Sequence, residues 1–252
     1  MKHCLKPAII IFLSFLSLSG AAYASNAQET FFQANQAYKS GNFSEALRLY
    51  SELEKEGQTS PHIPYNLGNT YFRLGDTGNA ILNYERAKIF MPRDADLNFN
   101  LGYVRDRIRD AIEPPATPLG TIFFWLDSFS PNETFIIFAI INFLFFTMLI
   151  LRMFIKQEWT FIMLIIFFVA WLGAGVSFGI KYYQVASDDR AVILASEASV
   201  LAGPDPKDTE LFKLHAGAIV KAEKKEGSWS LIKIQGDKRG WIPDSSIGMI
   251  KG

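Results

Sequence analysis

The chain has 252 residues, of which 49% are hydrophobic and 22 are phenylalanine, and its 25 basic and 25 acidic residues give a formal net charge of zero. This length predicts one or two domains, and the hydrophobic content is high for a soluble protein. Because the chain has no basic excess, we exclude binding to a nucleic-acid backbone, which requires one.

The first residues have the pattern of a secretory signal peptide. Two lysines precede an apolar run, and the small residues Ala22 and Ala24 follow it. This order predicts a signal peptide over residues 1–24, cut after Ala24, the alternative being an uncleaved anchor helix. The only cysteine, Cys4, lies in this segment, so the mature chain would have no disulfide and no cysteine-ligated metal.

A period of 34 residues runs through the next segment. The matching pairs are Ala34 and Gly68, Gly41 and Gly75, Ala46 and Ala80, Tyr50 and Tyr84, and Leu67 and Leu101. This period with these residue types is the signature of tetratricopeptide repeats (TPRs), in which small residues let antiparallel helices approach closely and aromatic residues fill the space beside them. We therefore predict an all-α TPR solenoid over residues 25–115, with Asn42 and Asp76 as helix caps.

The predicted repeats differ in quality. Residues 61–92 match the pattern almost fully, whereas residues 27–60 are degenerate. A third repeat begins at Asp94, and Pro114-Pro115 ends it after one helix, which would serve as a cap. Its charged residues are expected to face water, and they are Arg105, Asp106, Arg109 and Asp110.

The first helix of each repeat should line a concave groove, a surface that usually holds a peptide or a helix. The residues expected in the groove are Asn35, Lys39, Tyr65, Asn69, Phe72, Arg73 and Arg107. Asparagines and cations recur one period apart, and this resembles TPR grooves that clamp a peptide backbone and a carboxylate. The alternative is a solvated polar face without a ligand.

Two uncharged apolar stretches predict a transmembrane hairpin. Residues 134–151 and 159–180 are each long enough to cross a hydrocarbon core of about 30 Å. The loop of residues 152–158 contains Arg152 and Lys156, so the positive-inside rule places it in the cytoplasm and both ends of the hairpin outside. Neither stretch contains an ionisable residue, which argues against a proton or ion path.

Residues 116–133, between the repeats and the first span, are too short to cross a membrane. Aromatic side chains such as Phe124 and Trp125 predict a helix in the outer membrane interface, the alternative being a loop packed on the repeats. In the second span, Gly175 and Gly179 form a small-residue face that would pack the two spans together or pair two chains.

From residue 188 onward the pattern changes to short β-type runs separated by turn residues. Five or six such runs in residues 188–252 predict a small all-β barrel. The order of the SVLAGP, GSW and GWIP stretches resembles a bacterial SH3 domain, with Trp229 and Trp241 as its most specific residues. We expect at least one of these tryptophans in the barrel core, the alternative being an aromatic shelf that binds a peptide or cell-wall material.

The sequence shows no pattern typical of catalysis or of metal binding. His62 and His215 are isolated, without the carboxylate and nucleophile spacing of a triad or the spacing of a metal site. The glycines of the turn GDTGNA belong to the repeat, because the turn lacks the lysine of a phosphate-binding loop. We therefore predict no enzymatic activity, no cofactor and no metal.

Taken in order, these segments are similar to the BatE-type proteins of Bacteroides aerotolerance (Bat) operons, and residues 100–115, NLGYVRDRIRDAIEPP, are the most specific part of the resemblance. It implies a bacterial inner-membrane protein linked to oxygen or stress tolerance. The implied partners are membrane proteins with von Willebrand A-type domains and a MoxR-type ATPase.

Two functions remain open for this multidomain membrane protein. The first is a non-enzymatic inner-membrane scaffold that binds membrane or periplasmic proteins through periplasmic TPR and SH3-like modules. The second is an envelope protein that binds peptidoglycan through its SH3-like module.

Overall fold

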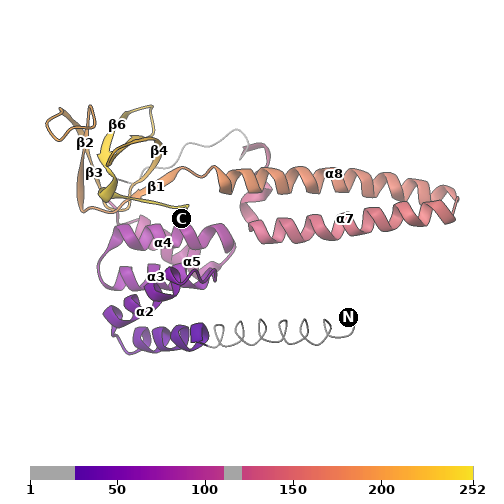
Figure 1. Ribbon diagram of the computed structural model, residues 1–252, viewed down its shortest axis with the longest axis horizontal. Helices are drawn as coiled ribbons and strands as arrows, with labels where there is room; N and C mark the ends of the chain where they lie inside the picture. The colour runs from indigo at the N-terminus through magenta and orange to yellow at the C-terminus, as the bar shows by residue number, and fades with distance from the viewer. Residues whose placement is uncertain (1–25, 111–120, 252) are drawn as a thin grey trace, which may run out of the picture.

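The computed structural model describes residues 26–110 and 121–251 (Figure 1). It consists of a helical domain (residues 26–110), a helical hairpin (residues 131–186) and a β domain (residues 190–251). The expected signal peptide, the two prolines that end the third repeat and the start of the linker lie outside the described residues.

The helical domain is a stack of antiparallel helices. A helix over residues 26–39 is followed by α2 (Phe43–Lys55), α3 (His62–Arg73), α4 (Thr77–Phe90) and α5 (Ala95–Arg105). The side chains of Asn42 and Asp76 accept hydrogen bonds from the backbone N–H three residues later, so both predicted caps are confirmed. A Cβ on Gly68 would lie 2.6 Å from the ring of Tyr84, which explains why only glycine fits where α3 crosses α4.

The hairpin consists of α7 (Pro131–Phe154) and α8 (Glu158–Ala186), which pack side by side and project away from the rest of the molecule (Figure 1). Both helices are long and apolar enough to cross a membrane. Between the two helices, Trp171 Nε1 donates a hydrogen bond of 2.9 Å to Asn142 Oδ1. A Cβ on Gly175 would lie 3.3 Å from the ring of Phe138, so this glycine serves the packing of the two helices on each other.

The β domain is one antiparallel sheet with the strand order β3-β2-β6-β5-β4-β1-β7. Its strands are β1 (Arg190–Ile193), β2 (Glu197–Leu201), β3 (Glu210–His215), β4 (Ile219–Glu226), β5 (Trp229–Lys233), β6 (Arg239–Pro243) and β7 (Ile247–Met249). Strand β3 is absent from the runs read in the sequence. It lies at the edge of the sheet and buries only Leu214, so its sequence carries no clear alternation.

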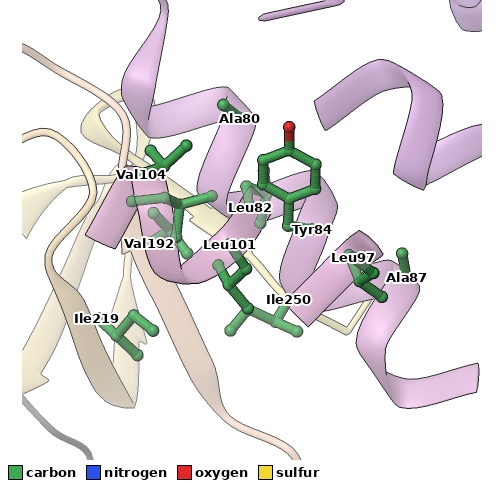
Figure 2. Packing of buried hydrophobic residues seen from close by; sticks show 11 residues of the cluster. Ala80, Leu82, Tyr84, Ala87, Leu97, Leu101, Val104, Val192, Ile219 and Ile250 are labelled. Atoms are coloured by element: carbon green, nitrogen blue, oxygen red, sulfur yellow. The ribbon is translucent and has the colours of Figure 1, made fainter. Parts of the chain in front are cut away.

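The helical domain and the β domain share one hydrophobic core, in which α4 packs against β1 and β7 (Figure 2). The helices contribute Ala80, Ile81, Leu82, Tyr84, Ala87, Leu97, Leu101 and Val104, and the β domain contributes Val192, Ile219 and Ile250. The backbones of the two domains lie close together at Gly78, where a Cβ would lie 2.8 Å from the carbonyl oxygen of Ile193. The helical domain and the β domain therefore form a single packed body.

Polar contacts surround this core and correct one prediction. Glu85, whose side chain is 3% exposed, forms salt bridges with Arg105 and with Arg190 of β1. Asp110 accepts hydrogen bonds from the backbone N–H of His215 at 2.7 Å and from its ring Nδ1 at 2.9 Å. Of the four charged residues expected to face water, Asp106 and Arg109 are exposed. The expectation was wrong for Asp110, which pairs with His215 of the β domain, and Arg105 is only partly exposed because it pairs with Glu85.

Candidate functional site

The predicted groove asparagines connect neighbouring helices. Asn35 Oδ1 accepts hydrogen bonds from Tyr50 Oη at 2.7 Å and from Asn66 Nδ2 at 3.2 Å. The same contacts, at 2.7 and 3.0 Å, recur one period later in Asn69, Tyr84 and Asn100. Since each asparagine oxygen already accepts two hydrogen bonds, what Asn35 and Asn69 can offer a ligand is the amide N–H.

Tyr50 and Tyr84 are protonated donors at neutral pH, and burial extends this state to higher pH. Burial raises the pKa of Tyr50 to about 12 and also raises the pKa of Tyr84 well above its ordinary value. Asn66 and Asn100, which complete the two networks, were not predicted as part of the site. Their spacing of one period was the signal that could have identified them.

A small pocket of about 180 Å³ opens where the helix over residues 26–39, α3 and α5 meet. Its lining consists of Tyr38, Asn69, Phe72, Arg73, Tyr84, Asn100, Tyr103 and Val104. Three of the predicted groove residues, Asn69, Phe72 and Arg73, therefore come together in one pocket. Tyr65 lies next to it, where its Oη accepts a hydrogen bond from Asn100 Nδ2 at 3.2 Å.

The predicted cations lie at the ends of the groove helices. The guanidinium carbon of Arg73 is 4.6 Å from the centre of the Phe43 ring, and that of Arg107 is 3.4 Å from the centre of the Tyr103 ring. Lys39 is exposed. Among the residues that the structure describes, none of the three cations forms a salt bridge, so their charge is available to a negative ligand.

Aromatic rings continue from this pocket along α5. Phe72 meets Tyr103 edge to face at 5.7 Å, and Phe99 stacks on Tyr103 at 6.4 Å. Phe99 is 71% exposed, and it follows Tyr65 by one period. The groove therefore combines amide donors, unpaired cations and aromatic faces, and its pocket lining contains no carboxylate. Such a surface is suited to a chain of carbonyl groups that ends in, or contains, a carboxylate.

The tryptophans of the β domain lie on the outer face of its sheet. Trp229 and Trp241 alternate with the buried residues of β5 and β6, both are half-buried, and neither belongs to the core cluster of this domain. Both tryptophans are partly buried, as expected, but they lie outside the core in which at least one was predicted. Leu231 pairs with Trp241 across the two strands. We call Trp229, Leu231 and Trp241 the tryptophan shelf; the helical domain packs on β1 and β7 instead.

The two described histidines have different surroundings. His62 is exposed at the start of α3. His215 contacts Asp110 and lies 2.9 Å from a guanidinium nitrogen of Arg109, so the prediction that it is isolated was wrong. Asp110 and Arg109 are more than a hundred residues away from it in the chain, whereas Glu197, 3.7 Å from its Nε2, is in the same domain. In the part of the chain that the structure describes, no group of three or more His, Cys, Asp or Glu residues is placed to hold a metal ion.

Comparison of the chain with protein-family models gives no match, and comparison with curated proteins gives none either. The function of the groove is therefore inferred from its own geometry.

Proposed function

We propose that this chain is a non-enzymatic scaffold of the bacterial inner membrane that binds partner proteins in the groove of its helical domain. In this proposal the helical domain is a TPR domain and the β domain is an SH3-like module. The observation that carries the proposal is a pocket in the groove whose lining includes Asn69, Arg73 and Tyr103 and contains no carboxylate. The unpaired cation Arg107 lies beside it, over the ring of Tyr103.

The shared core supports the proposed placement in the membrane. The helical domain precedes α7 and the β domain follows α8, so both adjoin the same end of the hairpin (Figure 1). Because they pack on each other, they must lie on the same side of a bilayer. Arg152 and Lys156 lie near the opposite turn, so by the positive-inside rule the common side is the periplasm.

The resemblance to BatE-type proteins supports a specific set of partners. These are membrane proteins with von Willebrand A-type domains and a MoxR-type ATPase system, with oxygen or stress tolerance as the associated trait. A scaffold on the membrane surface would act by holding such partners at a raised effective concentration.

Site-specific photocrosslinking in native membranes tests the groove. A photoreactive residue in place of Tyr103 should crosslink to membrane or periplasmic proteins, whereas one in place of Arg48, on the outer side of α2, should not. Changing Arg73 and Arg107 together to alanine should lower the crosslink yield by about tenfold or more, because two charged contacts are lost.

Equal yields at positions 103 and 48, or an unchanged yield in the double variant, would reject the groove as the binding surface. Asn69→Ala is less informative. It also removes the acceptor of Tyr84 Oη and of Asn100 Nδ2, so a loss of binding could reflect a loss of structure.

A second candidate function, binding of peptidoglycan, is favoured by the tryptophan shelf. Half-buried aromatic residues on the sheet face opposite the core are suited to stacking on sugars or peptide stems. The test is co-sedimentation of the solubilised full chain with purified sacculi. The isolated β domain is unsuitable, because it would expose Val192, Ile219 and Ile250.

If the shelf binds the cell wall, Trp241→Ala should reduce co-sedimentation while Phe99→Ala, a change in the groove, leaves it unaltered. Absence of co-sedimentation for the unmodified chain would exclude this function and leave the scaffold proposal in place.

A further inference from the structure

The segment before α7 folds back onto the outer end of the hairpin. It contains the short helix η1 (Phe124–Ser128), in which Leu126 is 1% exposed. The carbonyl oxygen of Leu126 accepts a hydrogen bond of 2.9 Å from Lys181 Nζ, and Lys181 is itself 8% exposed. Because this lysine belongs to α8, the contact fixes the height of η1 along the hairpin.

Three other large side chains of this segment are exposed. Ile122 is 63% exposed, Phe124 is 70% exposed and Trp125 is 41% exposed. The rings of Phe124 and Trp125 meet edge to face at 5.6 Å, so they form one surface. Tyr182 and Tyr183, next to Lys181 on α8, are also mostly exposed. Five large apolar or aromatic side chains thus lie uncovered near one level of the hairpin.

That level corresponds to the edge of a bilayer. From Glu158 to Lys181, α8 rises about 35 Å at about 1.5 Å per residue. A hydrocarbon core is about 30 Å thick, so a helix that crosses it from Glu158 reaches the headgroup region close to Lys181. Aromatic side chains concentrate in this region, because their rings are apolar and their edges or polar atoms tolerate water.

We infer that Ile122, Phe124 and Trp125 form an interfacial anchor, which inserts into the boundary between lipid headgroups and acyl chains on the side of the two soluble domains. The surface continues the apolar surface of the hairpin, and this continuity identifies lipid as its occupant. This inference rests on the membrane placement in the proposed function.

Nearby charges indicate that the anchor does not depend on anionic lipid. Arg93 is paired with Glu133, Lys181 is bound to the carbonyl of Leu126, and Asp127 is exposed. The positive charges near the anchor are balanced by carboxylates, so the affinity of the anchor for the membrane comes from its apolar side chains. Arg93 also lies 5.2 Å from the ring centre of Phe129, which connects the helical domain to the segment that carries the anchor. The anchor thereby holds the groove at a set height above the membrane.

Depth-dependent fluorescence quenching of the full chain in phosphatidylcholine nanodiscs tests the inference. After Cys4→Ser, single cysteines are introduced as Phe124→Cys, Phe143→Cys or Phe99→Cys and labelled with a small fluorophore. Phe143 is 69% exposed in the middle of α7, and Phe99 is 71% exposed on the helical domain, so all three positions accept a label on the surface. Nitroxides attached to lipid near the headgroup or deep in the acyl chain serve as quenchers.

The label at position 124 should be quenched several-fold more strongly by the shallow nitroxide than by the deep one, and equally in neutral and anionic nanodiscs. The label at position 143 should respond mainly to the deep nitroxide, and the label at position 99 to neither. If position 143 is quenched and position 124 is not, or if position 124 responds like position 143, the anchor is refuted and the membrane placement stands. If position 143 is unquenched as well, the membrane placement itself fails.

Discussion

The helices α2 and α4 occupy the same place in successive helix pairs, one 34-residue period apart, and their surfaces differ. The residues that α2 buries form one stripe and are Ala46, Leu49, Tyr50 and Leu53. Those that α4 buries surround the helix and are Gly78, Ala80, Ile81, Leu82, Asn83, Tyr84, Glu85 and Ala87. The outer side of α2 carries Arg48, which pairs with Glu45 and Glu52 in water.

This difference separates two sources of sequence constraint. The inner faces carry the same residue types, as Ala46 and Ala80 show, because both pack on the first helix of their own pair. The outer faces diverge, since the position of Arg48 in α2 is occupied by Leu82 in α4, which the β domain covers. A repeat period therefore specifies the inside of the stack, while its outside depends on what packs there.

Exchanging the residue types of Leu82 and Arg48, on the outer faces of α4 and α2, should reveal the largest difference in stability. Leu82→Arg places an unpaired charge in the core shared with Val192, Ile219 and Ile250, and should lower the free energy of unfolding by about 3–5 kcal/mol. The matched control Arg48→Leu should change it by no more than about 0.5 kcal/mol, because this side chain is exposed. Urea unfolding of the full chain in nanodiscs measures both, and equal effects would mean that the β domain does not cover α4.

A smaller loss of stability is expected at Gly78, where the backbones of the two domains lie close together. The Cβ of Gly78→Val would lie 2.8 Å from backbone atoms of Ile193 and Leu194, which cannot rotate away. The change should cost about 1–3 kcal/mol and increase protease cleavage between the domains. Ser44→Val, one period earlier and exposed, is the control, and it should leave both the unfolding midpoint and the cleavage pattern unaltered.

Equivalent mutations on the inner faces of α2 and α4 should lower stability by similar amounts. Tyr50→Phe and Tyr84→Phe each remove a hydroxyl that donates to a groove asparagine at 2.7 Å, so each should cost about 1 kcal/mol. Each asparagine oxygen keeps its second donor, which limits the loss. Urea unfolding in nanodiscs measures both losses. A several-fold difference between the losses of the two variants would show that the two hydrogen-bond networks are not equivalent.

The pH dependence of the same tyrosines gives the smallest effect, since it vanishes at neutral pH. Burial raises the pKa of Tyr84 and Tyr50 above the ordinary value of 10.0. An unfolded tyrosine releases its proton near pH 10 while the folded one retains it, so the folded state loses stability as pH rises above 10. Thermal unfolding should shift to lower temperature above that pH, and by less in Tyr84→Phe. An equal shift in the variant would contradict this assignment.

Much of the fold could be predicted from local patterns. The 34-residue period predicted the helix pairs, and the caps at Asn42 and Asp76 follow from preferences of single side chains. The apolar stretches predicted both long helices, although each extends beyond the predicted span because capped and polar residues at the ends remain helical. Strand β3 was missed because an edge strand with one buried residue has no alternation to detect.

The candidate site was predictable only in part. Asn69, Phe72 and Arg73 were placed in the groove by helical spacing, and the structure brings them to one pocket. Tyr103 was missed because it replaces the asparagine of the earlier repeats at the same period position. The one-period spacing of Asn66 and Asn100 marked them as equivalent positions, but the asparagine that each one contacts lies 31 residues away in the chain and became evident only in the structure.

By itself, the sequence determined the elements of this protein: the helix pairs, their caps, the two long apolar helices and most strands. Repeats, periodicity and hydrophobicity indicate these elements, because each depends on the residues within one segment and its neighbours in the chain. Only the tertiary structure decided that the β domain packs on α4, that Glu85 joins Arg105 to Arg190, and that Asp110 meets His215. Glu85 and Arg190 lie 105 residues apart, as do Asp110 and His215. The sequence does not distinguish a charged residue that is buried against a distant partner from one that faces solvent, because only the tertiary structure shows the partner.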